Sequence, residues 1–262
     1  MFDASARAMR RAVAVCLGVL VVLVLALAPT QAGAGAGLES TTGNEPLVIR
    51  HESRAVFAYP PAATATTAAS ARRPAVVYLN GLCGVTTNGC PHFHEGVAPF
   101  GWLVCPPANA KCPGGGASWS GPPSARRAVI DAAVSDVAQA FPELVDASAP
   151  TVLVGFSQGA YTALDVARVT PSKYTGLLLI GADVEPTPES LRAAGVTRIA
   201  LAAGAGDMAA APMRMTATAL AAAGVDARYF SLGKVGHTYV ADTDHTHALT
   251  EALAWVEGRE GI

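Results

Sequence analysis

The chain has 262 residues, of which 51% are hydrophobic and 15% are charged, and its formal net charge is −2. A chain of this length and composition can bury a full hydrophobic core and most simply forms one domain. The charge leaves no basic surface of the kind that binds nucleic acid, so we expect no nucleic-acid partner.

The amino-terminal segment predicts a secretory signal peptide. Three arginines precede an apolar run over residues 12–28, and small residues suited to cleavage follow that run. We therefore expect residues 1–36 to be a removed leader and residues 37–262 to form a single domain. The mature protein is then expected to be secreted or periplasmic, with no stable membrane span. Because the apolar run is long for a signal peptide, an uncleaved membrane anchor is the alternative.

Four cysteines lie beyond this leader, namely Cys83, Cys90, Cys105 and Cys112. An even number of cysteines in an exported chain predicts two disulfides. Four cysteines allow three connectivities, and the sequence does not select one. We favour the local pairs 83–90 and 105–112, because each closes a short loop rich in glycine and proline. A zinc site is disfavoured, since the spacings do not follow a Cys-x-x-Cys pattern.

The first half of the expected domain combines short strands with loops. Two short strands, 47–49 and 55–59, predict an antiparallel entry to a sheet, and a low-complexity loop over 60–74 follows them. Buried strands are then expected at 75–79 and 102–105. The next segments are a long loop over 106–123 and an amphipathic helix over 124–141.

The second half alternates strands with helices. This alternation implies a mostly parallel, doubly wound α/β sheet with helices on both faces, and with its reactive groups at the carboxyl ends of the strands. The interval between residues 180 and 198 is too short for a large lid domain. The expected strands are 151–154, 176–180, 199–207 and 229–237, and the expected helices follow residue 159, fall within 182–195, and span 213–223 and 246–257.

The most informative segment, residues 151–163, predicts a buried strand, a sharp turn that carries Ser157, and a helix. Gly155 and Gly159 lie two residues before and two residues after the serine, where a tight turn leaves no room for side chains. A serine in such a nucleophile elbow is presented at the amino terminus of the following helix. The pattern therefore predicts that Ser157 is a catalytic nucleophile.

A serine hydroxyl needs a histidine to accept its proton and a carboxylate to orient that histidine. Asp207 lies in a glycine-rich turn at the end of a predicted strand and is the expected acid, although it can also cap the next helix. Asp183, after the preceding strand, is the competing candidate. His237 follows the last predicted strand and is the expected base, in competition with His245 and His247.

In the elbow Gly-Phe-Ser-Gln-Gly and in the chain order serine, acid, histidine, the sequence resembles the α/β-hydrolase superfamily, and in particular its small carboxylesterases and acyl-thioesterase-like members. The resemblance implies an oxyanion hole formed by the backbone amide of Gln158 and by a second amide after the strand 75–79. That amide belongs to Leu82 or Cys83, and we favour Leu82. Relatives often carry His-Gly where this chain has Asn80-Gly81.

Other polar and aromatic groups have competing interpretations. Trp102, Trp119 and Phe93 either line a substrate pocket or pack in the core and loops. Two clusters resemble metal sites, but solvated loops explain both, so we expect no metal and no cofactor. The clusters are His92, His94 and Glu95, and Asp242, Asp244, His245 and His247.

Together these patterns predict a secreted serine hydrolase that cleaves a small-molecule or lipid-like ester or thioester through an acyl-enzyme. The nearest alternative enzyme is a serine peptidase of the same fold. An alternative of another class is a non-catalytic binding protein that retains the hydrolase scaffold.

Overall fold

The computed structural model describes residues 45–51, 54–62, 72–239 and 245–259. The predicted signal peptide and residues 63–71 of the low-complexity loop lie outside these segments. Within the described segments, no helix combines the length and the apolar character needed to cross a membrane.

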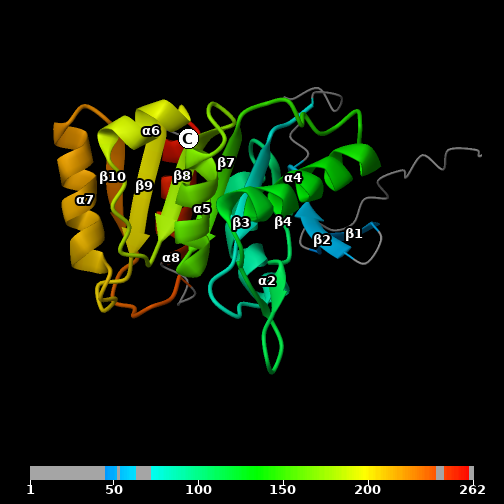
Figure 1. The fold of residues 1–262 in the computed structure, drawn as a ribbon, viewed down its shortest axis with the longest axis horizontal. Coiled ribbons are helices and arrows are strands. Elements are labelled where there is room, and N and C mark those ends of the chain that lie inside the picture. Colours follow the sequence, from blue (N-terminus) through cyan, green and yellow to red (C-terminus); the bar gives the residue numbers. More distant parts are fainter. Residues whose placement is uncertain (1–44, 52–53, 63–71, 240–244, 260–262) are drawn as a thin grey trace, which may run out of the picture. The chain divides into compact units, whose positions relative to one another are not determined.

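The centre of the fold is a sheet whose strand order is β1-β2-β4-β3-β7-β8-β9-β10 (Figure 1). From β4 to β10 all neighbouring strands are parallel, whereas β2 is antiparallel to both β1 and β4. The predicted antiparallel entry and the mostly parallel sheet are therefore both confirmed. The strands are β1 (Leu47–His51), β2 (Arg54–Tyr59), β3 (Ala75–Leu79), β4 (Trp102–Cys105), β7 (Thr151–Phe156), β8 (Tyr174–Ile180), β9 (Arg198–Ala203) and β10 (Asp226–Ser231).

The central strands are continuous apolar runs because helices cover both of their faces. Every residue of β3 and β4 is buried, and all but one residue in each of β7, β8 and β9 is buried. The outer strands β1 and β10 expose several of their residues.

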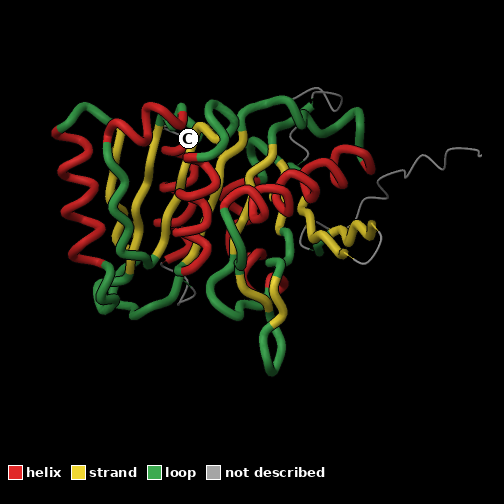
Figure 2. Tube along the Cα trace, viewed as in Figure 1, coloured by secondary structure: helices red, strands yellow, loops and turns green. Residues whose placement is uncertain are grey.

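Two buried clusters of side chains lie on opposite faces of the sheet. Helices cover both faces (Figures 1 and 2). One face carries α4 (Pro123–Ala140), α5 (Gln158–Arg168), α6 (Pro188–Ala194) and α7 (Ala210–Ala222). The other carries η1 (Cys90–Phe93), α3 (His94–Val97) and α8 (His245–Val256). The connection between β8 and β9 contains only α6, in agreement with the expected lack of a lid domain there.

Two regions contain structure that the sequence did not predict. Residues 86–97 form three consecutive short helical segments, α2 (Thr86–Gly89), η1 and α3. The expected long loop after β4 contains a small antiparallel hairpin of β5 (Ala110–Lys111) and β6 (Ala117–Ser118).

The four cysteines form two disulfides, but the predicted local pairing is wrong. The bonds are Cys83–Cys112 and Cys90–Cys105, with Cα separations of 5.6 and 6.2 Å, which lie in the usual range for disulfides. Tertiary contacts decide this pairing: η1 packs against β4, which brings Cys90 to Cys105. The β5–β6 hairpin meets the loop after β3 through a bridge between Gly84 and Ala117, which places Cys112 beside Cys83.

Candidate active site

Ser157 occupies a strained turn between β7 and α5. Its backbone angles are φ 52° and ψ −115°, outside the regions that residues with a side chain normally adopt, at a cost of about 1–3 kcal/mol. The turn is held on both sides, because the Ser157 amide donates to the Ile180 carbonyl at 2.8 Å and the Ser157 carbonyl accepts from the Ala160 amide at 3.0 Å. The strand, turn and helix expected from the sequence are all present.

Gly159 allows this turn to lie close to the neighbouring strand. A Cβ atom at this position would overlap the backbone carbonyl of Leu79, the last residue of β3. The first turn of α5 therefore lies directly against the end of β3, which brings the loop that follows β3 close to the serine.

The side chains of Ser157, Asp207 and His237, which follow the carboxyl ends of β7, β9 and β10, meet at the same edge of the sheet. The Nε2 atom of His237 lies 3.0 Å from Oγ of Ser157, and its Nδ1 atom lies 2.8 Å from Oδ2 of Asp207. An ionised carboxylate only accepts hydrogen bonds, so Nδ1 carries the proton and the lone pair of Nε2 faces the serine hydroxyl. This arrangement has the geometry of a nucleophile, a base and an orienting acid.

The acid in this arrangement is Asp207, and its two carboxylate oxygens have separate partners. Oδ2 contacts His237, while Oδ1 accepts from the backbone amide of Ala209 at 2.9 Å, just before α7. The contact with the imidazole is the one expected of the acid, whereas Asp207 does not cap α7, whose N-cap residue is Ala209 and whose first turn has no side-chain cap. Asp183 is exposed, and no contact joins its carboxylate to the imidazole.

Backbone hydrogen bonds join the loop of the acid to the loop of the histidine. Ala205 donates to the Gly233 carbonyl at 2.7 Å, and Gly206 donates to the Val235 carbonyl at 2.8 Å. The imidazole ring also packs against Phe156, with ring centroids 5.0 Å apart. These contacts fix the separation between the two loops and hence the orientation of the imidazole.

The other histidines considered as the base or as metal ligands occupy other positions. Burial lowers the pKa of both His92 and His94, whose rings pack near Tyr239 and Tyr59, respectively. His247 is exposed on α8, while residues 242 and 244 and the side chain of His245 lie outside the described residues. In the described part of the chain, no group of three or more histidine, cysteine, aspartate or glutamate side chains could hold a metal ion.

A cavity of about 440 Å³ opens beside the serine. At one side of it the hydroxyls of Tyr78 and Tyr239 form a hydrogen bond of 2.5 Å, and burial raises the pKa of both phenols. This pair was not predicted from the sequence, because Tyr78 is one more residue of a buried strand and no local pattern connects it to Tyr239. The cavity is lined by Tyr78, Asn80, Gly81, Leu82, Gly84, Val85, Asn88, Gly89, Phe156, Ser157, His237 and Tyr239.

The loop after β3 lies against the nucleophile. A Cβ atom on Gly81 would lie 3.3 Å from Cβ of Ser157, and Gly81 and Leu82 both line the cavity. Gln158 follows the serine directly as the first residue of α5. The structure thus brings both predicted oxyanion-hole residues, Leu82 and Gln158, next to Ser157.

The three aromatic residues considered for the pocket belong instead to the packing. Trp102 and Phe93 are fully buried, stacked on Phe141 and Tyr78, respectively. Trp119 is 5% exposed, and its indole N–H donates to the Asn80 carbonyl at 3.1 Å. None of the three lines the cavity beside the serine.

Neither the known family models nor the curated proteins match this chain. Solved structures do match it, and several of them are esterases. Esterase PE8 is 23% identical, with 76% of this chain and 97% of that chain covered and a TM-score of 0.57. A Bacillus cereus carboxylesterase is 15% identical, with coverage of 80% and 96% and a TM-score of 0.53.

A third similar structure is esterase Est2 from Thermogutta terrifontis, bound to propionate. It is 17% identical, with 83% of this chain and 93% of that chain covered and a TM-score of 0.53. At these identities the likeness establishes the fold. The sheet order, the elbow and the structural matches agree, and the chain has the α/β-hydrolase fold that its sequence resemblance implied.

Proposed function

We propose that this protein is a serine hydrolase that cleaves esters through an acyl-enzyme intermediate. The observation that carries the proposal is the continuous chain of contacts from Ser157 Oγ through the His237 imidazole to the Asp207 carboxylate. A hydroxyl, an imidazole and a buried carboxylate in this order generate a nucleophile at neutral pH.

In the proposed reaction, Ser157 Oγ attacks the ester carbonyl carbon while His237 Nε2 accepts the serine proton. The backbone amides of Gln158 and Leu82 stabilise the negative charge that develops on the carbonyl oxygen. His237 then gives its proton to the leaving alcohol or thiol, which leaves an acyl group on the serine. A water molecule, deprotonated by His237, releases the acid in the second half of the cycle. This route uses no cofactor.

The cavity and the fold relatives support a small acyl group as the substrate. A volume of about 440 Å³ lies in the range of small-molecule sites. Among the structures with this fold, Est2 from Thermogutta terrifontis has been solved with propionate and with butyrate bound. We propose short-chain esters as the preferred substrates, with thioesters as a second class that the same chemistry would cleave.

Two further features support export of the protein. Disulfides form and persist in oxidising compartments, and residues 1–36 have the sequence pattern of a signal peptide. We propose that the leader is removed and that residues 37–262 are secreted or periplasmic. Amino-terminal sequencing of the exported protein tests this. A first residue near 37 is expected, whereas a protein that still carries the leader would favour the uncleaved membrane anchor.

The experiment that tests the reaction compares wild-type protein with Ser157→Ala on p-nitrophenyl acetate and butyrate. We expect kcat/KM to fall by at least about 10³-fold, because the oxyanion hole and binding alone give only a small residual rate. Ser135→Ala, an exposed serine of α4, serves as the matched control. Full hydrolysis by Ser157→Ala would refute the proposal.

A fluorophosphonate probe distinguishes the enzyme from a non-catalytic binding protein of the same fold. The activated Ser157 is expected to form a covalent adduct that mass spectrometry locates in the peptide containing residue 157. The Ser157→Ala protein should remain unlabelled, while the Ser135→Ala control should label as the wild type does.

A further inference from the structure

We propose that residues 110–119 position the oxyanion hole, and that the side chain of Gln158 and the Cys83–Cys112 disulfide anchor these residues. We call residues 110–119 the strap and residues 80–84 the oxyanion loop. The inference rests on the proposed function, since it assigns a role in placing the Leu82 amide that would bind the oxyanion.

The oxyanion loop has internal hydrogen bonds from the Gly84 amide and the Asn80 side-chain amide to the Gly81 carbonyl, at 2.9 and 2.8 Å, but neither involves Leu82. Leu82 is 67% exposed and therefore gives the loop little packing against the core. Cys83 has φ 53°, a conformation that residues other than glycine rarely adopt. A donor in an oxyanion hole has to be held in place before the reaction, because its benefit depends on the distance to the developing charge. The segment around Leu82 therefore gains its support from contacts outside the loop.

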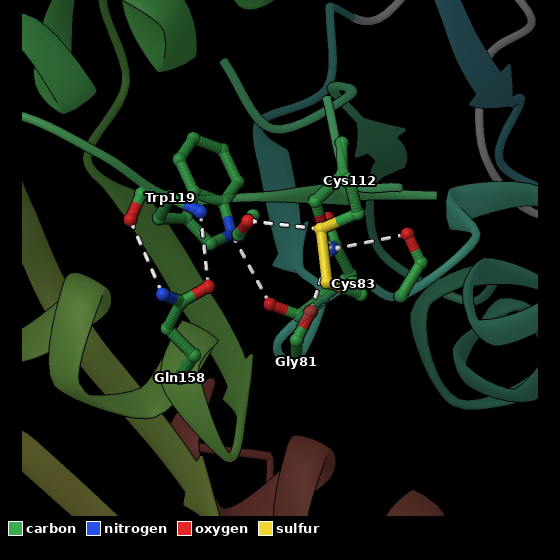
Figure 3. Close-up of a disulfide and its surroundings, with 9 residues drawn as sticks. Gly81, Cys83, Cys112, Trp119 and Gln158 are labelled. Carbon is green, nitrogen blue, oxygen red and sulfur yellow. Dashed lines mark hydrogen bonds between the residues drawn. A yellow bond between two sulfur atoms is a disulfide. The ribbon is translucent and has the colours of Figure 1, made fainter. Parts of the chain in front are cut away.

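The strap supplies this support through one covalent bond and several hydrogen bonds. Cys112 forms a disulfide with Cys83, the residue that follows Leu82 in the sequence (Figure 3). The Ala117 amide donates to the Gly84 carbonyl at 3.0 Å, and the Ala117 carbonyl accepts from the Asn80 side-chain amide at 2.8 Å. Both ends of the oxyanion loop are thus tied to the strap.

The strap and the oxyanion loop lie very close to each other. A Cβ atom on Gly116, which has φ 70°, would overlap the backbone carbonyl of Cys83. The indole N–H of Trp119 adds a hydrogen bond of 3.1 Å to the Asn80 carbonyl from within the buried part of the strap. The strap and the oxyanion loop therefore form one packed unit beside the nucleophile.

Gln158 joins this unit to the catalytic elbow. Its Oε1 accepts from the Trp119 amide at 2.9 Å, and its Nε2 donates to the Trp119 carbonyl at 3.2 Å, as Figure 3 shows. The same residue follows Ser157 and is expected to provide the other oxyanion donor through its backbone. One residue thus presents one amide directly and fixes the position of the second amide through the strap.

Release of either anchor is expected to displace the Leu82 amide while Ser157, His237 and Asp207 stay in place. Loss of an oxyanion donor lowers kcat by about 10²–10³-fold in serine hydrolysis, so displacement of one donor should lower it by about 10- to 100-fold. The Michaelis constant should change by less than about threefold, because the donor acts on charge that develops in the transition state.

The first experiment reduces the anchoring disulfide in the folded protein. Cys83 is exposed and Cys112 is partly exposed, whereas Cys90 and Cys105 are fully buried, so brief treatment with a water-soluble phosphine should open the 83–112 bond first. The phosphine is oxidised to its oxide with oxygen from water, and the disulfide becomes two thiols. Alkylation and mass spectrometry establish which bond has opened.

We expect the protein reduced only at 83–112 to lose about 10- to 100-fold in kcat and to regain it on reoxidation. An unchanged kcat in protein shown to carry both free thiols would overturn the inference. Absence of hydrolysis and of fluorophosphonate labelling in the oxidised protein would instead overturn the proposed function, and the inference with it.

The second experiment changes the other anchor without touching a cysteine. Gln158→Met keeps the backbone amide and the side-chain length but removes both hydrogen bonds to Trp119. Its affinity for an arylboronic acid, whose tetrahedral adduct occupies the oxyanion hole, should fall together with kcat. The matched control is Gln139→Met, on the exposed face of α4, which should leave both values unchanged. A Gln158→Met protein with wild-type kcat and boronate affinity would contradict a positioning role.

Discussion

The Asp207 carboxylate lies 2.8 Å from Nδ1 of His237, and the two side chains differ sharply in their access to solvent. The carboxylate is 5% exposed, whereas the imidazole is 52% exposed. The carboxylate is thus shielded by the protein, and the imidazole is accessible from solvent.

Replacement of Asp207 by asparagine is expected to lower kcat by about 10³- to 10⁴-fold with little change in KM. The asparagine side-chain amide can donate to Nδ1 and so stabilise the tautomer whose Nε2 carries the proton, which cannot accept the proton of Ser157. Steady-state kinetics on p-nitrophenyl butyrate measure the effect. Asp183→Asn, the matched change at the exposed competing aspartate, should leave kcat unchanged, and the opposite result would reassign the acid.

The Tyr78–Tyr239 pair is expected to show strong coupling in a double-mutant cycle. Each single change to phenylalanine leaves one buried hydroxyl without its partner and should lower the free energy of unfolding by about 1–2 kcal/mol. The double variant, which removes both hydroxyls, should be no less stable than either single variant. Urea unfolding measures all four proteins, and additive losses would show that the two hydroxyls do not depend on each other.

The carboxyl of Glu257, just after α8, is expected to make the free energy of unfolding depend on pH. Burial raises the pKa of this carboxyl from 4.5 to about 7, and the charge of Arg259 partly opposes the shift. The folded protein therefore holds this proton more tightly than the unfolded chain. The stabilising contribution of this carboxyl is fully present below pH 4.5, where it is protonated in both states, and is lost as the pH rises to about 7.

Glu257→Gln should remove this dependence. We expect the variant to be more stable than wild type by about 2–3 kcal/mol at pH 8 and to differ little from it at pH 4.5. Thermal or urea unfolding at both pH values tests this, with Glu251→Gln at an exposed position of α8 as control. A stability difference that does not change with pH would contradict the shifted carboxyl.

The Cys90–Cys105 disulfide is expected to act on stability and not on catalysis. It closes a loop with a sequence separation of 15, so Cys90→Ala with Cys105→Ala should lower the free energy of unfolding by about 3 kcal/mol. Because this bond joins η1 to β4 and not the strap to the oxyanion loop, kcat should stay within about twofold of wild type. A fall in kcat equal to that of the 83–112-reduced protein would remove the distinction between the two disulfides.

Local patterns in the sequence predicted the sheet and the elbow because each has a local cause. Strands covered on both faces appear as uninterrupted apolar runs, and the elbow appears as two glycines around a serine, where any Cβ would meet a neighbouring backbone. The positions of Asp207 and His237 follow from the rule that reactive groups lie at the carboxyl ends of parallel strands. Boundaries differ by a few residues, as for α4, expected at 124–141 and found at Pro123–Ala140.

The features that escaped prediction all depend on contacts between distant segments. The cysteine pairing follows from which segments pack together, because η1 lies against β4 and the strap lies against the oxyanion loop. Residues 86–97 are too short for a helical periodicity, and their turns are stabilised by the burial of Phe93 and Val97. The hydrogen bonds of Gln158 to the strap join residues 39 positions apart, which no local pattern indicates.

The separation of 80 positions between Ser157 and His237 in the sequence has a consequence for how the proposed activity would arise. During synthesis β3, β7 and α5 are complete before residue 237 is added, so the proposed nucleophile exists before its proposed base. In a growing chain the Ser157 hydroxyl therefore has no imidazole partner until β10 has joined the sheet. On the proposed mechanism, a chain still in synthesis would therefore have no esterase activity until residue 237 has been added.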